Sequence, residues 1–92
     1  MPKFIAVHPL DQPVSKENVV PVAKKCKSMV STDAYWVKSW LELNDEGEVA
    51  VVYCEWDGKD VDTVKEALTK SIPELPFTKV CEMSEIHGED FR

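Results

Sequence analysis

The sequence predicts an α+β fold in which one strand and one helix lie on each side of a central β-hairpin. The hairpin gives the clearest signal. Two runs rich in β-branched and aromatic residues, 34–43 and 48–56, flank a short polar segment that ends at Gly47. Apolar residues at three- and four-residue spacing on either side of the hairpin predict two amphipathic helices. The 92 residues suffice for a single domain, 1–92, with a modest core.

The first strand and the first helix precede the hairpin. An apolar run predicts a strand over 3–8, which Pro9 ends. The helix can begin after Asn18, which places Pro21 in the first turn where no hydrogen bond is lost, or after Ser15, which places a kink there. Its predicted buried stripe consists of Val19, Val22, Ala23, Cys26, Met29 and Val30.

The second helix and the last strand follow the hairpin. Asp60 is placed to cap a helix that Pro73 and Pro76 end, and an apolar run over 77–86 predicts the last strand. The inner face of this helix is predicted to carry Val61, Val64, Leu68 and Ile72. A polar tail begins at about residue 87.

Together these elements predict the order strand, helix, strand, strand, helix, strand. With right-handed crossovers, this order gives a four-stranded antiparallel sheet with strand order 4-1-3-2 and both helices on one face. The fold class is therefore ferredoxin-like βαββαβ, and one face of the sheet has no helix to cover it.

Apolar side chains on that open face predict a second copy of the chain. Strand alternation assigns Trp36, Lys38, Trp40 and Glu42 to the open face, and the strand over 49–54 is apolar on both faces. Two tryptophans in water are unfavourable on a small monomer. We therefore expect a homodimer that packs sheet on sheet, with room for a pocket between the sheets.

Composition limits the partners and the compartment. The net charge of −6, with 11 Lys and Arg against 17 Asp and Glu, argues against nucleic acid. No apolar run approaches the length of about 20 residues that a membrane span needs, so no membrane partner is expected. The start of the chain lacks the regions of a signal peptide. Three widely separated cysteines suit reduced thiols, and we expect a cytoplasmic protein.

The hairpin also carries two short motifs, W-V-K-S-W at 36–40 and Y-C-E-W-D-G at 53–58. They resemble the W-V-x-S-aromatic and Y-C-x-aromatic motifs of a bacterial family of small domains of unknown function. The opening M-P-K-F-I and the segment 80–83 are also typical of it, whereas the longer hairpin and Trp in place of Tyr are departures. The resemblance implies a fold of the dimeric α+β barrel type, and it suggests nickel as a cofactor because one member is a nickel-binding protein.

The candidate metal ligands are His8, Cys54 and His87. Nickel accepts imidazole, thiolate and carboxylate ligands, but this chain shows no close ligand spacing. The predicted topology places the two histidines at opposite ends of the sheet, which counts against a compact two-histidine site within one subunit. A site across a dimer and one in the acidic tail remain open. The alternative is that His8 ends a strand and that His87 belongs to a solvated tail.

The candidate residues for a small ligand are aromatic, together with one cysteine: Trp36, Trp40, Tyr53, Cys54 and Trp56. An aromatic wall suits an apolar molecule, while the alternative is simple packing at an interface. A nucleophilic Cys54 would need a partner that stabilises its thiolate, and its neighbour Glu55 would disfavour that form. We therefore expect a dimeric ligand- or metal-binding domain. The alternatives are a cofactor-free enzyme, monooxygenase- or isomerase-like, and a plain protein-interaction module.

Overall fold

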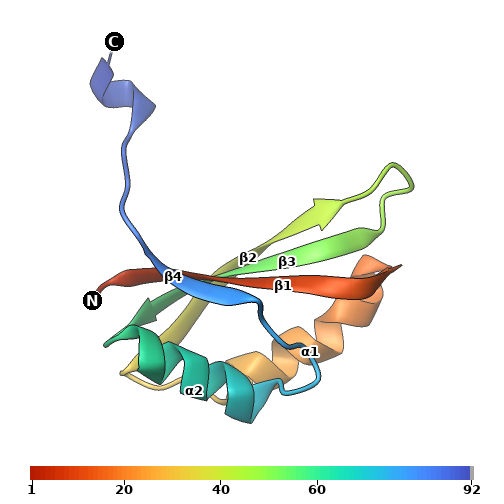
Figure 1. Cartoon of the computed structure of the whole chain (residues 1–92), viewed down its shortest axis with the longest axis horizontal. Helices are drawn as coiled ribbons and strands as arrows, with labels where there is room; N and C mark the ends of the chain where they lie inside the picture. Colours follow the sequence, from red (N-terminus) through yellow and green to blue (C-terminus); the bar gives the residue numbers. More distant parts are fainter. Residues whose placement is uncertain (92) are drawn as a thin grey trace.

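The computed structural model describes residues 1–91 and follows the predicted order of elements (Figure 1). In chain order they are β1 (Lys3–Val14), α1 (Lys16–Ser28), β2 (Ala34–Leu43), β3 (Val49–Gly58), α2 (Val61–Ser71), β4 (Lys79–Met83) and a short 3-10 helix (Gly88–Phe91). Within residues 1–91, no helix is long and apolar enough to cross a membrane.

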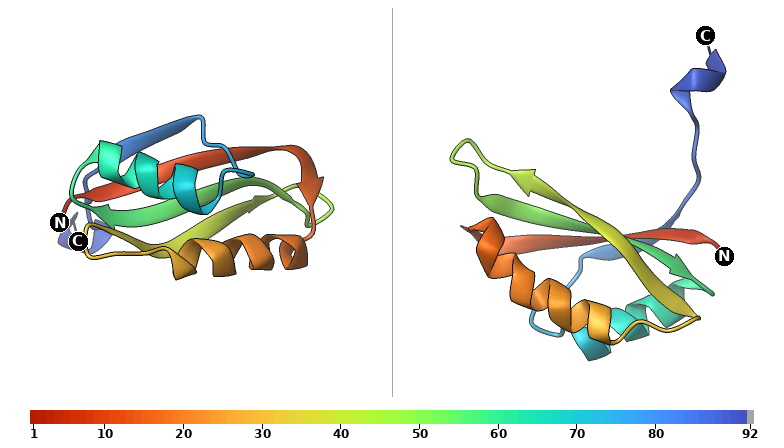
Figure 2. Two further views of the ribbon diagram at one scale, coloured as in Figure 1. Left: turned by 90° about the horizontal axis from the view of Figure 1, so that it is seen from below. Right: turned by 180° about the vertical axis from the view of Figure 1, so that it is seen from behind.

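The four strands form one antiparallel sheet in the order β2-β3-β1-β4. This is the predicted order 4-1-3-2 counted from the other edge, so the ferredoxin-like topology is confirmed. Both helices lie on the same side of the sheet, and the other side has no covering element among residues 1–91 (Figure 2). We call that uncovered side the open face.

Strand β1 is longer than predicted, because it continues through Pro9 to Val14. Its pairing with β4 ends at Val7, so beyond that residue one edge of β1 has no strand beside it. Proline is tolerated on such an edge because no ladder hydrogen bond is lost. The register against β3 shifts between Pro9 and Val14, which is a second sign of irregular pairing there.

The residue before each helix, its N-cap, determines where the helix begins. Helix α1 begins after Ser15, whose carbonyl accepts from the Asn18 amide at 3.0 Å, so Pro21 lies inside the helix. This is the second of the two predicted starts. Helix α2 begins after Asp60 as predicted, and the Asp60 carboxylate accepts from the Thr63 amide at 2.8 Å.

A bulge in β2 changes the faces that its residues occupy. Trp36 pairs with Trp56, whereas Lys38 already pairs with Glu55, so Val37 is the extra residue. Trp56 faces the helices and Glu55 faces the open side. The bulge therefore places Trp36 on the helix side, and the predicted position of Trp36 on the open face is wrong.

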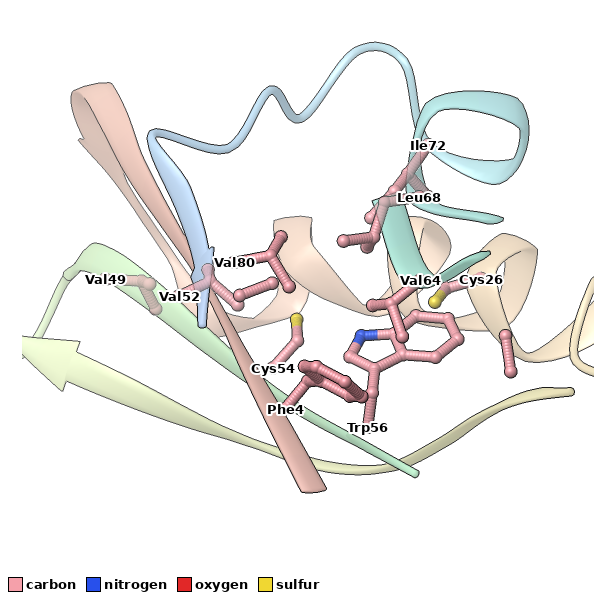
Figure 3. Packing of buried hydrophobic residues seen from close by; sticks show 12 residues of the cluster. Phe4, Cys26, Val49, Val52, Cys54, Trp56, Val64, Leu68, Ile72 and Val80 are labelled. Atoms are coloured by element: carbon pink, nitrogen blue, oxygen red, sulfur yellow. The ribbon is translucent and has the colours of Figure 1, made fainter. Parts of the chain in front are cut away.

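The core lies between the helices and the sheet (Figure 3). Its largest fully buried side chains include Trp56, Leu68 and Ile72. Helix α2 approaches β3 closely, since a Cβ at Gly58 would overlap the side chain of Val64. Strand β4 ends at Met83 instead of 86, and the segment 84–91 extends away from the sheet (Figure 1).

Candidate functional site

An apolar cavity of about 210 Å³ lies between α1 and the helix side of the sheet. Helix α1 leaves this space because its inward side chains are short. Cys26 is the residue of α1 that is buried. The described lining comprises Lys16, Val19, Val20, Val22, Ala23 and Cys26 of α1, Trp36, Ser39 and Leu41 of β2, Val52 and Cys54 of β3, and Ile72 and Leu75 after α2. Valine, alanine and cysteine do not reach far enough to fill the gap to the sheet, so the cavity follows from the sequence of α1.

A chain of hydrogen bonds crosses the wall that the sheet contributes. The indole N–H of Trp36 donates to Ser39 Oγ at 3.0 Å, and the Ser39 hydroxyl donates to Cys54 Sγ at 3.2 Å. The bulge at Val37 makes this chain possible, because it turns Trp36 to the same side of β2 as Ser39. The polar groups of the wall thus satisfy one another and leave a surface that is largely apolar.

Both thiols of the cavity are protonated at neutral pH. Burial, with a smaller contribution from the nearby Cys54, raises the pKa of Cys26 to about 11. Burial also raises the pKa of Cys54, against the hydrogen bond from Ser39, which lowers it. Because the thiolate is the nucleophile and the metal ligand, neither group is activated for those roles in this state.

The five residues predicted to form an aromatic ligand site are divided among three environments. Trp36 and Cys54 line the cavity. Trp56 lies in the core with 1% of its surface exposed, and its indole nitrogen has no hydrogen-bond partner among residues 1–91. Trp40, 63% exposed, pairs with Tyr53 on the open face. The predicted wall of Trp36 and Trp40 on one face is therefore wrong, and the bulge is the reason.

The three predicted metal ligands do not come together within one protomer. His8 is fully buried, and its Nδ1–H donates to the Leu75 carbonyl at 3.0 Å. Burial lowers the pKa of His8, against the raising effect of backbone carbonyls. Cys54 lies in the cavity, and His87 lies beside Glu85 in the exposed segment. Among residues 1–91 no three His, Cys, Asp or Glu side chains converge, so these ligands do not fit a site in one protomer. Metal binding itself stays a prediction.

Several cavity residues were not predicted as site residues. Cys26 was predicted only as part of the buried stripe of the first helix, and Ser39 appeared only within the motif at 36–40. Leu75 follows α2, in a segment for which the sequence predicted only that prolines end the helix. The small side chains on the inner face of α1, such as Ala23, were the available signal.

The fold is similar to that of a known structure, that of the protein SCO4226 from Streptomyces coelicolor A3(2). The two align with a TM-score of 0.69 over 92% of this chain and 99% of the other, at 11% sequence identity. At that identity the likeness concerns the fold alone. A comparison with protein-family models found no match, and neither did a comparison with curated proteins.

Proposed function

We propose that this protein is a homodimeric binding protein whose cavity beneath α1 holds a small, neutral, apolar molecule. The observation that carries the proposal is the cavity itself, which combines apolar walls with two protonated thiols. Lys16, an exposed residue, is the charged group in its described lining. A charged ligand would lose its hydration without gaining a buried partner, so a neutral one is favoured.

The cavity volume limits the ligand to about one or two fused rings. An apolar cavity of roughly 150 Å³ in a protein core stays dry and binds benzene. The cavity beneath α1, at about 210 Å³, has room for a molecule between benzene and indole in size. Ligands with so few atoms bind with dissociation constants from about micromolar to millimolar, because their contact area is small.

The same geometry favours binding over catalysis. The Ser39 hydroxyl donates to a sulfur atom and has no imidazole to activate it among the described contacts. The buried His8 is not among the described residues that line the cavity. A cofactor-free enzyme of the monooxygenase or isomerase type would need a base with a lone pair directed at the substrate.

The homodimer is proposed because the open face exposes aromatic and apolar side chains. Trp40 is 63% exposed there and lies beside Tyr53, which in turn lies beside Val7 in the sheet. A large aromatic side chain beside other apolar groups marks an interaction surface. A second copy that covers this face buries Trp40, and an isologous arrangement does the same for both protomers.

The ligand proposal is tested by NMR titration of ¹⁵N-labelled protein with benzene and with indole. We expect saturable shifts at the amides of Ala23, Cys54 and Leu75, which line the cavity. Ala23→Leu fills the cavity and abolishes the shifts. Lys24→Leu puts the same side chain on the exposed side of α1 and leaves binding intact. Equal binding by both variants would refute the cavity as the site.

Native mass spectrometry of protein purified without chelator or affinity tag tests the metal prediction. Titration with nickel, zinc and copper is expected to leave the protein free of stoichiometric metal, because within residues 1–91 three ligands do not converge in one protomer. A dimer with stoichiometric metal that Cys54→Ser or His8→Ala removes would overturn the ligand proposal. It would place a metal site across the two subunits instead.

A further inference from the structure

The C-terminal arm, residues 84–91, leaves the end of β4 and extends away from the domain on the side opposite the helices (Figure 1, Figure 2). All of its residues are exposed, including Ile86 at 82% and Phe91 at 72%. An ion pair within the arm joins His87 Nε2 to Glu85 Oε2 at 2.9 Å. Two large apolar side chains thus stand in water on a segment that adds no buried residue to the core.

The open face carries a strip of apolar side chains on which the apolar side chains of the arm could pack. Cross-strand pairing aligns Trp40, Tyr53 and Val7 in one row across β2, β3 and β1. The next rows add Ile5 beside Cys81 and Val51 beside Pro9. These side chains are exposed or half-buried, because nothing among residues 1–91 packs on them.

We propose that the C-terminal arm of each protomer lies across the open face of a second copy of this chain. In this arrangement the arm places Ile86 and Phe91 on the strip that contains Trp40. Because both protomers do the same, the exchange forms a closed two-fold contact. This inference rests on the proposed homodimer and is independent of the ligand in the cavity.

The length of the arm fits this role. Four extended residues span about 13 Å, and the four residues of its 3-10 helix add about 8 Å. Three spacings between neighbouring strands amount to about 15 Å, so the arm is long enough to cross the four-stranded sheet. Folding back onto its own sheet would require a turn just after Met83, and residues 84–87 form neither a turn nor a bend.

Charge offers a local match at the lysines of the outer strands, although the open face also carries Glu42, Glu55 and Asp57. The arm contributes Asp90, whereas its Glu85 already pairs with His87. Lys38 of β2 lies over the ring of Trp40 at 5.0 Å, and Lys79 lies on β4, at the other edge of the sheet. Within residues 1–91 neither of these two lysines forms an ion pair with a carboxylate.

Lys3 differs from these two lysines, because it already pairs with carboxylates of its own chain. Its ammonium lies 2.7 Å from Glu55 and 2.7 Å from Asp57, so this central cation is already paired with two carboxylates. The lysines at the two edges are the ones left to meet an acidic arm from a partner.

The test compares dimerisation of four forms of the chain by analytical ultracentrifugation. They are the full chain, a chain that ends at Met83, the variant Ile86→Asp with Phe91→Asp, and the control Thr32→Asp with Thr69→Asp. The control adds the same charge at exposed positions away from the arm and the open face. Far-UV circular dichroism verifies that each form is folded.

We expect the full chain and the control to dimerise equally. Loss of the arm, or of its two apolar side chains, should raise the dimer dissociation constant roughly 100-fold or more, since four buried side chains are lost per dimer. Isotope-filtered NOEs in mixed dimers should connect Ile86 and Phe91 of one protomer to Val7 and Tyr53 of the other.

Each contrary result has a distinct meaning. If the truncated chain dimerises as tightly as the full chain, the arm exchange is refuted while the homodimer stands. If the full chain is a monomer at NMR concentrations, both the homodimer and the arm exchange are refuted. NOEs from the arm to the open face within one chain would then identify the arm as a cover for its own sheet.

Discussion

Acid should destabilise this protein through His8, which is fully buried on the helix side of β1. Its Nδ1–H donates to the Leu75 carbonyl, and its Nε2 has no hydrogen-bond partner within the described residues. Burial lowers the pKa of His8 in the folded state. The unfolded chain therefore binds the proton first as the pH falls, and stability present above the unfolded pKa of about 6.5 is lost below it.

The size of the effect follows from proton binding by the unfolded chain. If His8 remains neutral in the folded state, lowering the pH from 7.5 to 5.5 reduces the free energy of unfolding by about 1.4 kcal/mol. For a domain of this size the melting temperature then falls by roughly 5 to 10 °C. This is the upper limit, because protonation of His8 within the folded state reduces it.

Urea unfolding followed by far-UV circular dichroism measures this dependence at pH 5.5, 6.5 and 7.5. Protein concentration is held constant, because dimerisation would add its own contribution. His8→Gln should remove the loss between these pH values, whereas His87→Gln in the exposed arm should keep it. The reasoning fails if the pH dependence survives His8→Gln or disappears in His87→Gln.

Three further substitutions test the packing around the core and the cavity. Gly58→Ala should cost about 1–3 kcal/mol of unfolding free energy, because its Cβ overlaps the side chain of Val64. Leu68→Ala should cost about 2–5 kcal/mol, since this side chain is only 1% exposed. Ser39→Ala should cost about 1 kcal/mol, because it leaves the indole N–H of Trp36 without its acceptor. Urea midpoints measure all three.

Each of these substitutions has a matched control. Gly88→Ala should be neutral, because nothing lies within 4 Å of its added Cβ. Leu43→Ala should change stability by less than about 0.5 kcal/mol, since that side chain is 56% exposed. Combining Ser39→Ala with Trp36→Phe should cost less than the sum of the single changes, because both partners of the bond are removed. Equal losses in variant and control would contradict the assigned contacts.

The topology was predictable because its signals are local. The hairpin turn needs a residue in the left-handed region, and Gly47 supplies it with φ of 78°. The start of α2 needs an acceptor for a free amide, and Asp60 provides one. Each element could therefore be recognised from a few neighbouring residues, and the crossover rule then left one natural strand order.

The face of Trp36 was not predictable in the same way. Residues 35–43 show no glycine or other irregularity at Val37, so simple alternation put Trp36 and Trp40 together. With the bulge, Trp36 pairs with Trp56 of the neighbouring strand and its indole N–H reaches Ser39 of its own strand. Such contacts depend on tertiary packing, which overrides the local pattern.

The cavity also lies beyond pattern analysis, because a void reflects the sum of side-chain volumes between two elements. Cys26 of the predicted α1 stripe is buried as expected, but Met29 follows the last helical residue and is 51% exposed, so its predicted burial is wrong. The periodicity of that stripe says which side faces the sheet, but it does not say how far the helix stands from it.

The separation of the three tryptophans gives the protein an optical reporter for each of its three regions. Trp36 borders the cavity, Trp40 stands in water on the open face, and Trp56 is enclosed in the core. Chains that keep only one indole, with phenylalanine at the other two positions, would emit from one region at a time. Ligand entry, association of two chains and unfolding could then be followed as separate fluorescence signals in a single sample series.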